Sequence, residues 1–370
     1  MVFVVPKTSN VRFYDFGETR DALEGIDLLM DQELGKSIRP CSRVAIKIHF
    51  GERGNYTYIR PAFVRRVVDL VKKEGAYPFI AETTTLYPMG HRMTVQESLE
   101  TAKYNGFSEE GLGCPIVIAD EPDGQNGIEF KIDWVQSNNV MQKVAVARHL
   151  AEADSVIVIS HVKGHLLTGM GGALKNLGMG CTTRDSKKDQ HAAHGLLFDY
   201  EKCSGCGKCI EVCKFNALTM QNGKPLRDED RCMYCNTCWL NCTSDAIDLL
   251  KDGKERFQRA LAYAAAGVMR AFMGKEVIFL NAICDVTQFC DCAAPAGRLV
   301  TQNVGFLESG DPVAIDKASL DLLDQAPLIP GWDVSPPDIL GKINETSSRI
   351  HIEEAERLGL GNTSYSLTRL

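Results

Sequence analysis

Eight cysteines in two runs are the residues of this sequence whose spacing points most directly to chemistry. Each run reads Cys-x2-Cys-x2-Cys-x3-Cys, first over 203–213 and again over 232–242. Three thiolates on one tight loop can each bind one corner of a cubic iron–sulfur cluster, and in two-cluster ferredoxins the last cysteine of each run ligates the other cluster. The spacing therefore predicts two [4Fe–4S] clusters. The predicted ligands are Cys203, Cys206, Cys209 and Cys242 for one, and Cys213, Cys232, Cys235 and Cys238 for the other.

The two cysteine runs belong to an internal repeat. Asp199 and Ala217 recur as Asp228 and Ala246 at the same offset as the cysteines. Each half would supply a ligand loop, a short helical turn and a strand, and two such halves make the small α+β fold of two-cluster ferredoxins, which residues 196–250 resemble. The sequence departs from the usual ferredoxin loops because no proline follows the fourth cysteine of either run.

Two other uses of these cysteines fit the pattern less well. Structural zinc favours two Cys-x2-4-Cys pairs separated by a longer loop, so three cysteines spaced by two would leave one thiol unused. Disulfides require an oxidising compartment, and the start of the chain has neither a basic segment nor a signal-peptidase site. Iron–sulfur ligation is the reading that uses all eight thiols.

Length and charge bound the remaining functions. The chain has 370 residues, 44% of them hydrophobic, and a net charge of −7. It is long enough for two or three domains, and without a cluster of lysine and arginine we expect no nucleic-acid partner. The longest apolar run, 260–269, is too short for a bilayer span of about 20 residues. We therefore expect a cytoplasmic protein with no membrane partner.

Strand and helix patterns alternate on both sides of the cysteine repeat. Near-continuous apolar strands separated by helices indicate a mostly parallel sheet with helices on both faces. The expected strands are 3–5, 43–48, 77–81, 115–119, 155–160, 276–281 and 299–307, and the expected helices are 20–34, 61–73, 95–105, 140–153, 255–273, 312–323 and 347–358.

The simplest organisation is one α/β domain that the ferredoxin-like module interrupts. Residues 1–195 would form its first part, residues 196–250 the module, and residues 251–370 its second part. The last part alone offers too few strands for an independent sheet. The predicted fold class is thus an α/β domain with an inserted small α+β domain.

Polar residues follow several of the expected strands. His49, Glu82, His161 with Lys163, and Cys284 each lie just beyond a strand end. Ligands of open parallel sheets bind in the crevice outside the carboxyl ends of the strands, so these five are candidate catalytic or binding residues. A cation-rich crevice of this kind would take a small anionic ligand.

A glycine-rich segment follows the most apolar strand. Its glycines could let backbone N–H groups approach an anion, helped by Lys163 and Lys175, or could serve only to pack a tight turn and a helix against the sheet. It is neither a Walker loop nor a dinucleotide fingerprint. Both readings stay open.

Further cysteines and histidines could form a third metal site. Cys181 with His191 and His194 is one set, for which the spacing favours ordinary surface positions. The second set is Cys284, Cys290, Asp291 and Cys292, for which buried or redox-active free cysteines are the favoured reading.

Several of these motifs together resemble the iron–sulfur family called domain of unknown function 362. The matching segments are 49–55, 161–181, 290–292, 311–316 and 359–361. The resemblance covers essentially the whole chain, and it implies a redox role with a two-cluster ferredoxin module but no agreed substrate.

Two function classes follow. In the first, the protein carries single electrons through two clusters to or from an unidentified redox partner protein, and the α/β domain recognises that partner or a ligand. In the second, it is a ferredoxin-linked reductase of a small anionic or carbonyl substrate in the crevice. No nucleophile, flavin or nicotinamide motif is evident, so the sequence does not decide whether the protein is an enzyme.

Overall fold

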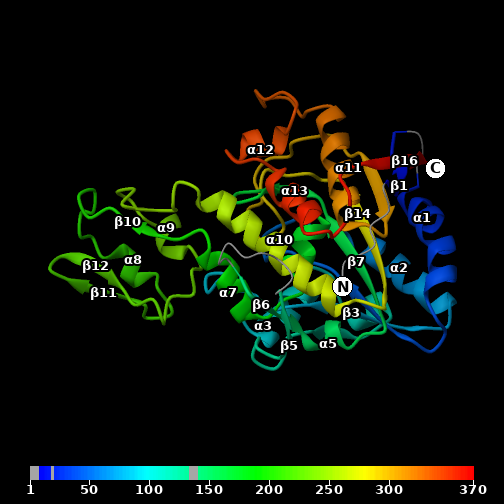
Figure 1. Ribbon diagram of the computed structural model, residues 1–370, viewed down its shortest axis with the longest axis horizontal. Helices are drawn as coiled ribbons and strands as arrows, with labels where there is room; N and C mark the ends of the chain where they lie inside the picture. The colour runs from blue at the N-terminus through cyan, green and yellow to red at the C-terminus, as the bar shows by residue number, and fades with distance from the viewer. Residues whose placement is uncertain (1–7, 18–20, 133–140) are drawn as a thin grey trace.

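An eight-stranded sheet forms the body of the molecule, and helices cover both of its faces (Figure 1). The computed structural model describes residues 8–17, 21–132 and 141–370. In spatial order the strands are β16 (Tyr365–Arg369), β1 (Ser9–Asp15), β15 (Gly305–Ser309), β14 (Glu276–Ile283), β7 (Ser155–His161), β2 (Arg43–Lys47), β3 (Tyr77–Glu82) and β4 (Ile116–Ile118). Neighbouring strands from β14 to β4 pair in parallel, and so do β1 and β16, whereas β15 is antiparallel to both of its neighbours.

Successive side chains along the strands point to opposite faces of the sheet, and each face has its own apolar core. Val158 of β7 belongs to the core that includes Leu174, whereas its neighbour Ile157 belongs to the core that includes Val67 on the other face. The helices of the first core include α6 (Ala173–Gly178), α10 (Gly253–Ala271), α11 (Pro312–Gln325) and α13 (Ile350–Arg357). Those of the second core are α1 (Ala22–Ser37), α2 (Pro61–Lys73), α3 (Val95–Tyr104) and α4 (Glu109–Leu112).

Local sequence explains where the main helices begin. Pro61 occupies the first position of α2, where a missing N–H costs nothing. Asp311 caps α11 by accepting hydrogen bonds from the backbone N–H groups of Val313 and Ala314, at 2.8 and 2.9 Å. The predicted fold class, a mostly parallel α/β sheet covered on both faces, is confirmed.

Several predicted elements need correction. The helix expected over 140–153 is wrong: the chain forms strand β6 (Lys143–Ala147), paired with β5 (Gly127–Lys131), followed by the short helix α5 (Arg148–Ala151). The strand expected at 299–307 begins later, at Gly305, and the one expected at 3–5 lies outside the described residues. The sequence analysis also missed β1, β16, α12 (Ile339–Ile343) and the hairpin of β8 (Lys163–His165) with β9 (Gly169–Gly171).

The cysteine-rich segment forms a small module beside the sheet (Figure 1). Helix α7 (Arg184–Ala192) leads into it. The two halves of the module repeat in backbone conformation as well as in sequence. Equivalent positions adopt left-handed conformations in both halves: Gly205 and Tyr234, Gly207 and Asn236, and Asn216 and Asp245. The module's elements are β10 (Leu197–Phe198), α8 (Lys208–Glu211), β11 (Leu218–Gln221), β12 (Lys224–Arg227), α9 (Thr237–Leu240) and β13 (Ile247–Asp248).

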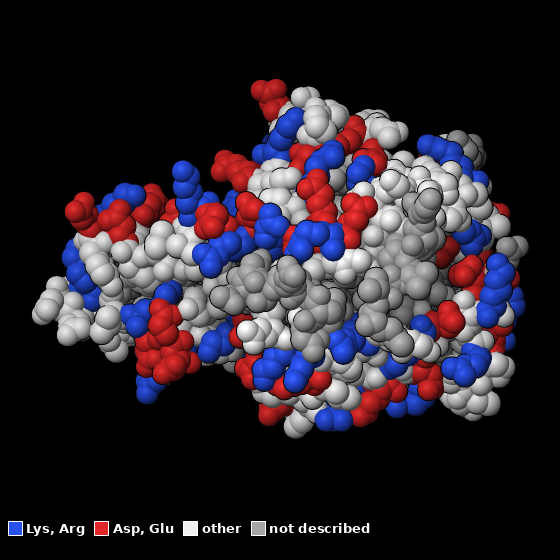
Figure 2. Space-filling model, viewed as in Figure 1, with Lys and Arg blue, Asp and Glu red and all other residues white. Residues whose placement is uncertain are grey.

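The surface carries charges of both signs. Basic and acidic side chains alternate over the face that Figure 2 shows, on the module as well as on the sheet body. Within the described ranges, no helix combines the length and apolar character needed to cross a lipid bilayer.

Excision of residues 199–246 tests the predicted division of the chain at 196–250. Strands β10 and β13 pair antiparallel, so an Asn-Gly turn can join Phe198 to Ile247 as a two-residue hairpin. We expect a protein without iron that still unfolds in one cooperative step, because closing a short loop costs little. Thermal unfolding by circular dichroism, beside the intact chain, measures this.

The shortened protein should be less stable than the intact chain. Leu196 and Phe257 pack with module residues in one apolar cluster and would lose that cover. An insoluble product, or a broad transition without cooperativity, would show instead that the module completes the core of the α/β domain.

Candidate functional site

The predicted cysteine quartets line two separate cavities in the module. Each cavity takes three cysteines from one loop and the fourth from the other half of the repeat, which is the arrangement that a pair of cubic clusters needs. The first is lined by Cys203, Cys206, Cys209 and Cys242 and the second by Cys213, Cys232, Cys235 and Cys238.

Backbone N–H groups point at the crossing cysteine of each quartet. Ala217 N–H donates to Cys213 Sγ at 3.4 Å, and Ala246 N–H donates to Cys242 Sγ at 3.3 Å. Donors of this kind favour a thiolate and tune a bound iron–sulfur cluster. The residues present therefore fit such clusters in both cavities.

A polar crevice of about 100 Å³ lies at the carboxyl ends of the central strands. Strands β3 and β4 lie on one side of β2, and β7 and β14 on the other, so the strand order reverses there. Such a reversal is where open α/β sheets bind ligands. Of the five predicted residues, the crevice is lined by His49, Glu82 and His161, whereas Lys163 and Cys284 lie behind its wall.

A buried ion pair forms one wall of the crevice. Lys47 Nζ lies 2.8 Å from Glu82 Oε1, and both side chains are almost fully buried. Lys47 also donates to the Ile48 carbonyl and to Asn176 Oδ1, which compensates part of the cost of burying its charge. The second carboxylate oxygen of Glu82 has no hydrogen-bond partner in the described structure.

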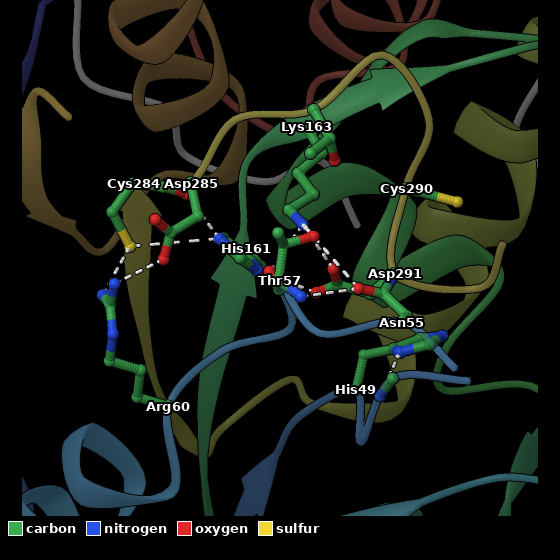
Figure 3. A network of polar contacts seen from close by, with 12 residues as sticks. His49, Asn55, Thr57, Arg60, His161, Lys163, Cys284, Asp285, Cys290 and Asp291 are labelled. Carbon is green, nitrogen blue, oxygen red and sulfur yellow. Dashed lines mark hydrogen bonds and ion pairs between the residues drawn. The ribbon is translucent and has the colours of Figure 1, made fainter. Parts of the chain in front are cut away.

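Asp291 lies at the centre of a second buried network (Figure 3). Its carboxylate accepts from His161 Nδ1 at 2.8 Å and pairs with Lys163 Nζ at 2.8 Å. Lys163 also donates to the Thr57 carbonyl and hydroxyl. Two of the predicted ligand-binding residues therefore hold Asp291 in place.

The charges in this network fix its protonation. Burial alone would lower the pKa of His161, but the Asp291 carboxylate raises it to about 9, so the ring is an imidazolium at neutral pH. Burial alone would raise the pKa of Asp291, but His161 and Lys163 lower it well below its usual range. By contrast, burial and the nearby Arg92 lower the pKa of His49, which is neutral.

Cys284 is buried away from the crevice. Its Sγ lies 3.9 Å from His161 Nε2 and accepts weakly from Arg60 Nη1 at 3.8 Å (Figure 3). Its carbonyl accepts a 2.6 Å hydrogen bond from the same histidine. Cys284 therefore positions the back of His161. Asn281, at the same strand, bonds Asp316 and Ser319 and does not face the crevice.

Two cations in the crevice have unused donor groups. Arg92 contacts Glu52 through Nε and His49 through Nη1, but its buried Nη2 has no hydrogen-bond partner among the described residues. Lys175 lines the crevice, and no described residue accepts a hydrogen bond from it or pairs with its charge. Burial, then the charge of Arg92, lowers the pKa of Lys175 to about 8.

The sequence analysis missed Arg92 because it lies in an irregular stretch between β3 and α3. Lys47 could have been found from the sequence: it is a charged residue that directly follows the apolar run Val44–Ile46 in β2, two positions before His49 and hence on the same side of the chain.

Glycines make room for the crevice lysines. A Cβ on Gly171 would lie 2.9 Å from Lys175 Cδ, and one on Gly180 would lie 2.8 Å from Lys47 Nζ. The glycine-rich segment also packs closely elsewhere, since a Cβ on Gly178 would collide with the Leu261 carbonyl of α10. The glycines of this segment therefore allow close packing against the crevice lysines and against α10.

The proposed surface histidines are buried. His191 is 2% exposed and His194 is fully buried, so the surface assignment is wrong. Cys181 is buried too, and burial raises the pKa of its thiol to about 12. A different trio gathers at the crevice, where ligand atoms of His165, Cys290 and Cys292 lie within 4.8 Å of one another.

Ring contacts connect the crevice to the second cysteine cavity. Tyr234 lines that cavity, and its ring centroid lies 6.4 Å from that of His194. His194 contacts His191 at 5.6 Å, and His191 lines the crevice. A continuous path of packed rings therefore runs from the module into the crevice.

A family model described as domain of unknown function (DUF362) matches residues 44–321. The chain belongs to this family. Its ferredoxin-like stretch is 38% identical over 56 residues to an uncharacterized ferredoxin of Methanocaldococcus jannaschii, covering 14% of this chain and 73% of that protein. It is also 42% identical over 31 residues to ferredoxin-2 of Desulfomicrobium norvegicum, covering 8% and 52%. The DUF362 chain thus carries a ferredoxin-type iron–sulfur module, and the predicted resemblance is confirmed.

Two solved structures are similar at low identity. The lactate racemase apoprotein of Thermoanaerobacterium thermosaccharolyticum is 14% identical with a TM-score of 0.35, covering 77% of this chain and 54% of that one. A Thermotoga maritima protein from a structural genomics programme is 11% identical with a TM-score of 0.40, covering 82% and 57%. The chain spans a little over half the length of each.

Replacing the Asp291 carboxylate tests the buried charge network. We expect Asp291→Asn to lower the free energy of unfolding by about 3–5 kcal/mol, because two buried cations lose their anion. Anaerobic urea unfolding measures the change. Glu129→Gln removes an exposed partner of Lys143 and, as the matched control, should cost about 0–1 kcal/mol.

The loss should depend on pH with a defined sign. The pKa of His161 is raised when folded, so its contribution is fully present below its ordinary pKa of 6.5 and is lost as pH rises through about 9. The difference in free energy of unfolding between wild type and Asp291→Asn should therefore decrease over this pH range. A gap that widens toward alkaline pH would contradict the assignment.

Proposed function

We propose that this protein transfers single electrons through two [4Fe–4S] clusters and that its α/β domain recognises a small anion in the crevice. The observation that carries the first half is the geometry of the cysteines: each quartet encloses its own cavity, with one ligand crossing from the other half. When bound, such clusters would supply one electron at a time. A redox partner protein would exchange these electrons.

The anion half of the proposal rests on the crevice cations. Among the described residues, Arg92 Nη2 and Lys175 Nζ both have unused N–H donors, although Arg92 is already paired with Glu52 through Nε. A carboxylate or similar anion would accept from both, and charge-assisted hydrogen bonds in a dry site are the strong kind. Glu82 and Asp291 are already paired with lysines and so oppose such an anion less.

A reductase is the second candidate. The ring contacts from Tyr234 through His194 to His191 favour it, because they place aromatic groups continuously between one cysteine cavity and the crevice. His161 is an imidazolium whose pKa is about 9 and lines the same crevice. Its two ring N–H groups donate to Asp291 and to the Cys284 carbonyl, so it would supply positive charge beside a bound substrate. The carrier and the reductase differ in whether the bound anion is consumed.

Iron analysis tests the clusters. Anaerobically purified protein should contain about eight iron and eight sulfide per chain. Cys213→Ser should lose about four iron, because it removes the crossing ligand of the second quartet. Cys41→Ser, at an exposed cysteine outside the module, should keep all of it. Zinc in place of iron, or full iron in Cys213→Ser, would refute the ligand assignment.

Titration calorimetry with sulfate and oxalate tests the anion site. We expect Lys175→Gln to weaken binding of the better anion by about tenfold or more, since a hydrogen bond to a charged group contributes about 1.5–3 kcal/mol. Wild-type affinity should fall as pH rises through about 8, where Lys175 loses its proton. Neither anion titrates above neutral pH, so the protein is the source of any change.

Lys103→Gln is the matched control for this experiment. It removes an exposed ammonium on α3 and should bind as wild type does. Equal affinity of the Lys175 and Lys103 variants for the anion would exclude the crevice as the anion site. Consumption of the added anion under reducing conditions would favour the reductase over the carrier.

A further inference from the structure

Cys290 and Cys292 face the crevice from a loop that follows β14. They are joined by a disulfide, with their Cα atoms 5.4 Å apart, and both line the crevice. Neither cysteine belongs to the quartets of the module, and neither is used by the anion site.

The loop is held firmly against the sheet. Asp291, between the two cysteines, is anchored by His161 and Lys163, and its carbonyl accepts from Glu52 N–H at 2.8 Å. On the other side Gly164 N–H donates to the Thr287 carbonyl at 3.0 Å. A Cβ on Gly164 would collide with the Gln288 carbonyl oxygen, so only glycine lets β8 come this close.

His165 stands beside both sulfurs, and its hydrogen bonds argue against a metal. Its Nδ1 accepts from the backbone N–H groups of Leu167 and Thr168, both at 3.2 Å. In the neutral ring the single proton must then be on Nε2. A histidine that binds a metal through one ring nitrogen normally donates an N–H from the other. In His165 the other nitrogen would be Nδ1, which accepts hydrogen bonds instead of donating one. The ring's donor is therefore its Nε2 N–H, and one ring nitrogen lies within 4.8 Å of both sulfurs.

The cationic surroundings favour a reactive thiol. Lys175 and the His161 imidazolium line the same crevice as the two cysteines. Positive charge and an N–H donor stabilise a thiolate, which is the form that attacks and re-forms disulfides. Cys181 lies in the apolar core instead, and its thiol donates to the Asn176 carbonyl.

We propose that Cys290 and Cys292 are a two-electron redox couple that opens and closes at the crevice. In the reduction, the Cys290–Cys292 S–S bond breaks as two electrons and two protons are taken up, giving two thiols. The electrons come from a low-potential iron–sulfur donor used twice, and the protons come from solvent. The source of the electrons rests on the proposed function, but the existence of the couple does not.

Thiol trapping tests the couple directly. Anaerobic holoprotein is equilibrated in dithiothreitol buffers of graded potential, quenched in acid, alkylated with N-ethylmaleimide in denaturant, and digested with trypsin. The peptide 276–298 contains Cys284, Cys290 and Cys292 and no cluster ligand. We expect it to change from one label to three in a single step, with the slope of about 30 mV per tenfold that a two-electron couple gives.

Cys284 is the internal control, since it should carry a label in every sample. The Cys290→Ser variant should carry two labels at every potential. Three labels in wild type at all potentials would overturn the couple, and so would a bound zinc that is lost in Cys290→Ser. Iron measured in the same samples reports separately on the clusters, so failure of the proposed function cannot be mistaken for failure of this couple.

Discussion

The buried carboxylate of Asp291 is the interaction on which the crevice depends. It neutralises His161 at the end of β7 and Lys163 in β8, two cations that would otherwise be costly to bury. One anion between two cations also leaves a positive excess near the crevice, which suits the recognition of an anion. Because the same residue separates Cys290 from Cys292, the charge network and the position of both sulfurs are set together.

Close backbone approach is the second constraint. Gly164 lets β8 lie against the cysteine loop, and Gly178 lets α6 lie against α10. Asp316 accepts from Ala173 and Leu174 N–H groups at the start of α6, and so fixes the helix that carries Lys175. Glycines at the contacts allow the sheet, the loop and α10 to meet around one lysine without collision.

Local pattern was enough for most of the fold and for the membership of each quartet, because cysteine spacing and apolar periodicity are local properties. It failed where tertiary context decides. Residues 143–147 form a strand although the stretch 140–153 has helical spacing, since β5 offers a pairing partner 12 or more residues away in the chain. Burial of His194 depends on the module packing over it, and the role of Arg92 depends on Glu52 from another segment, so no local signal marks either.

A departure from repeat symmetry shows how the module is adapted to its host. Gly205 and Tyr234 occupy equivalent positions, both with left-handed backbone, which is free of strain for glycine but costs about 1–3 kcal/mol for other residues. The second half accepts this strain, and its tyrosine donates to Glu229 and contacts His194 of the α/β domain. The Tyr234 ring contacts His194 of the α/β domain, and this contact accounts for the strained residue at this position. Because Tyr234 also lines the second cysteine cavity, that cavity is the one connected to the crevice.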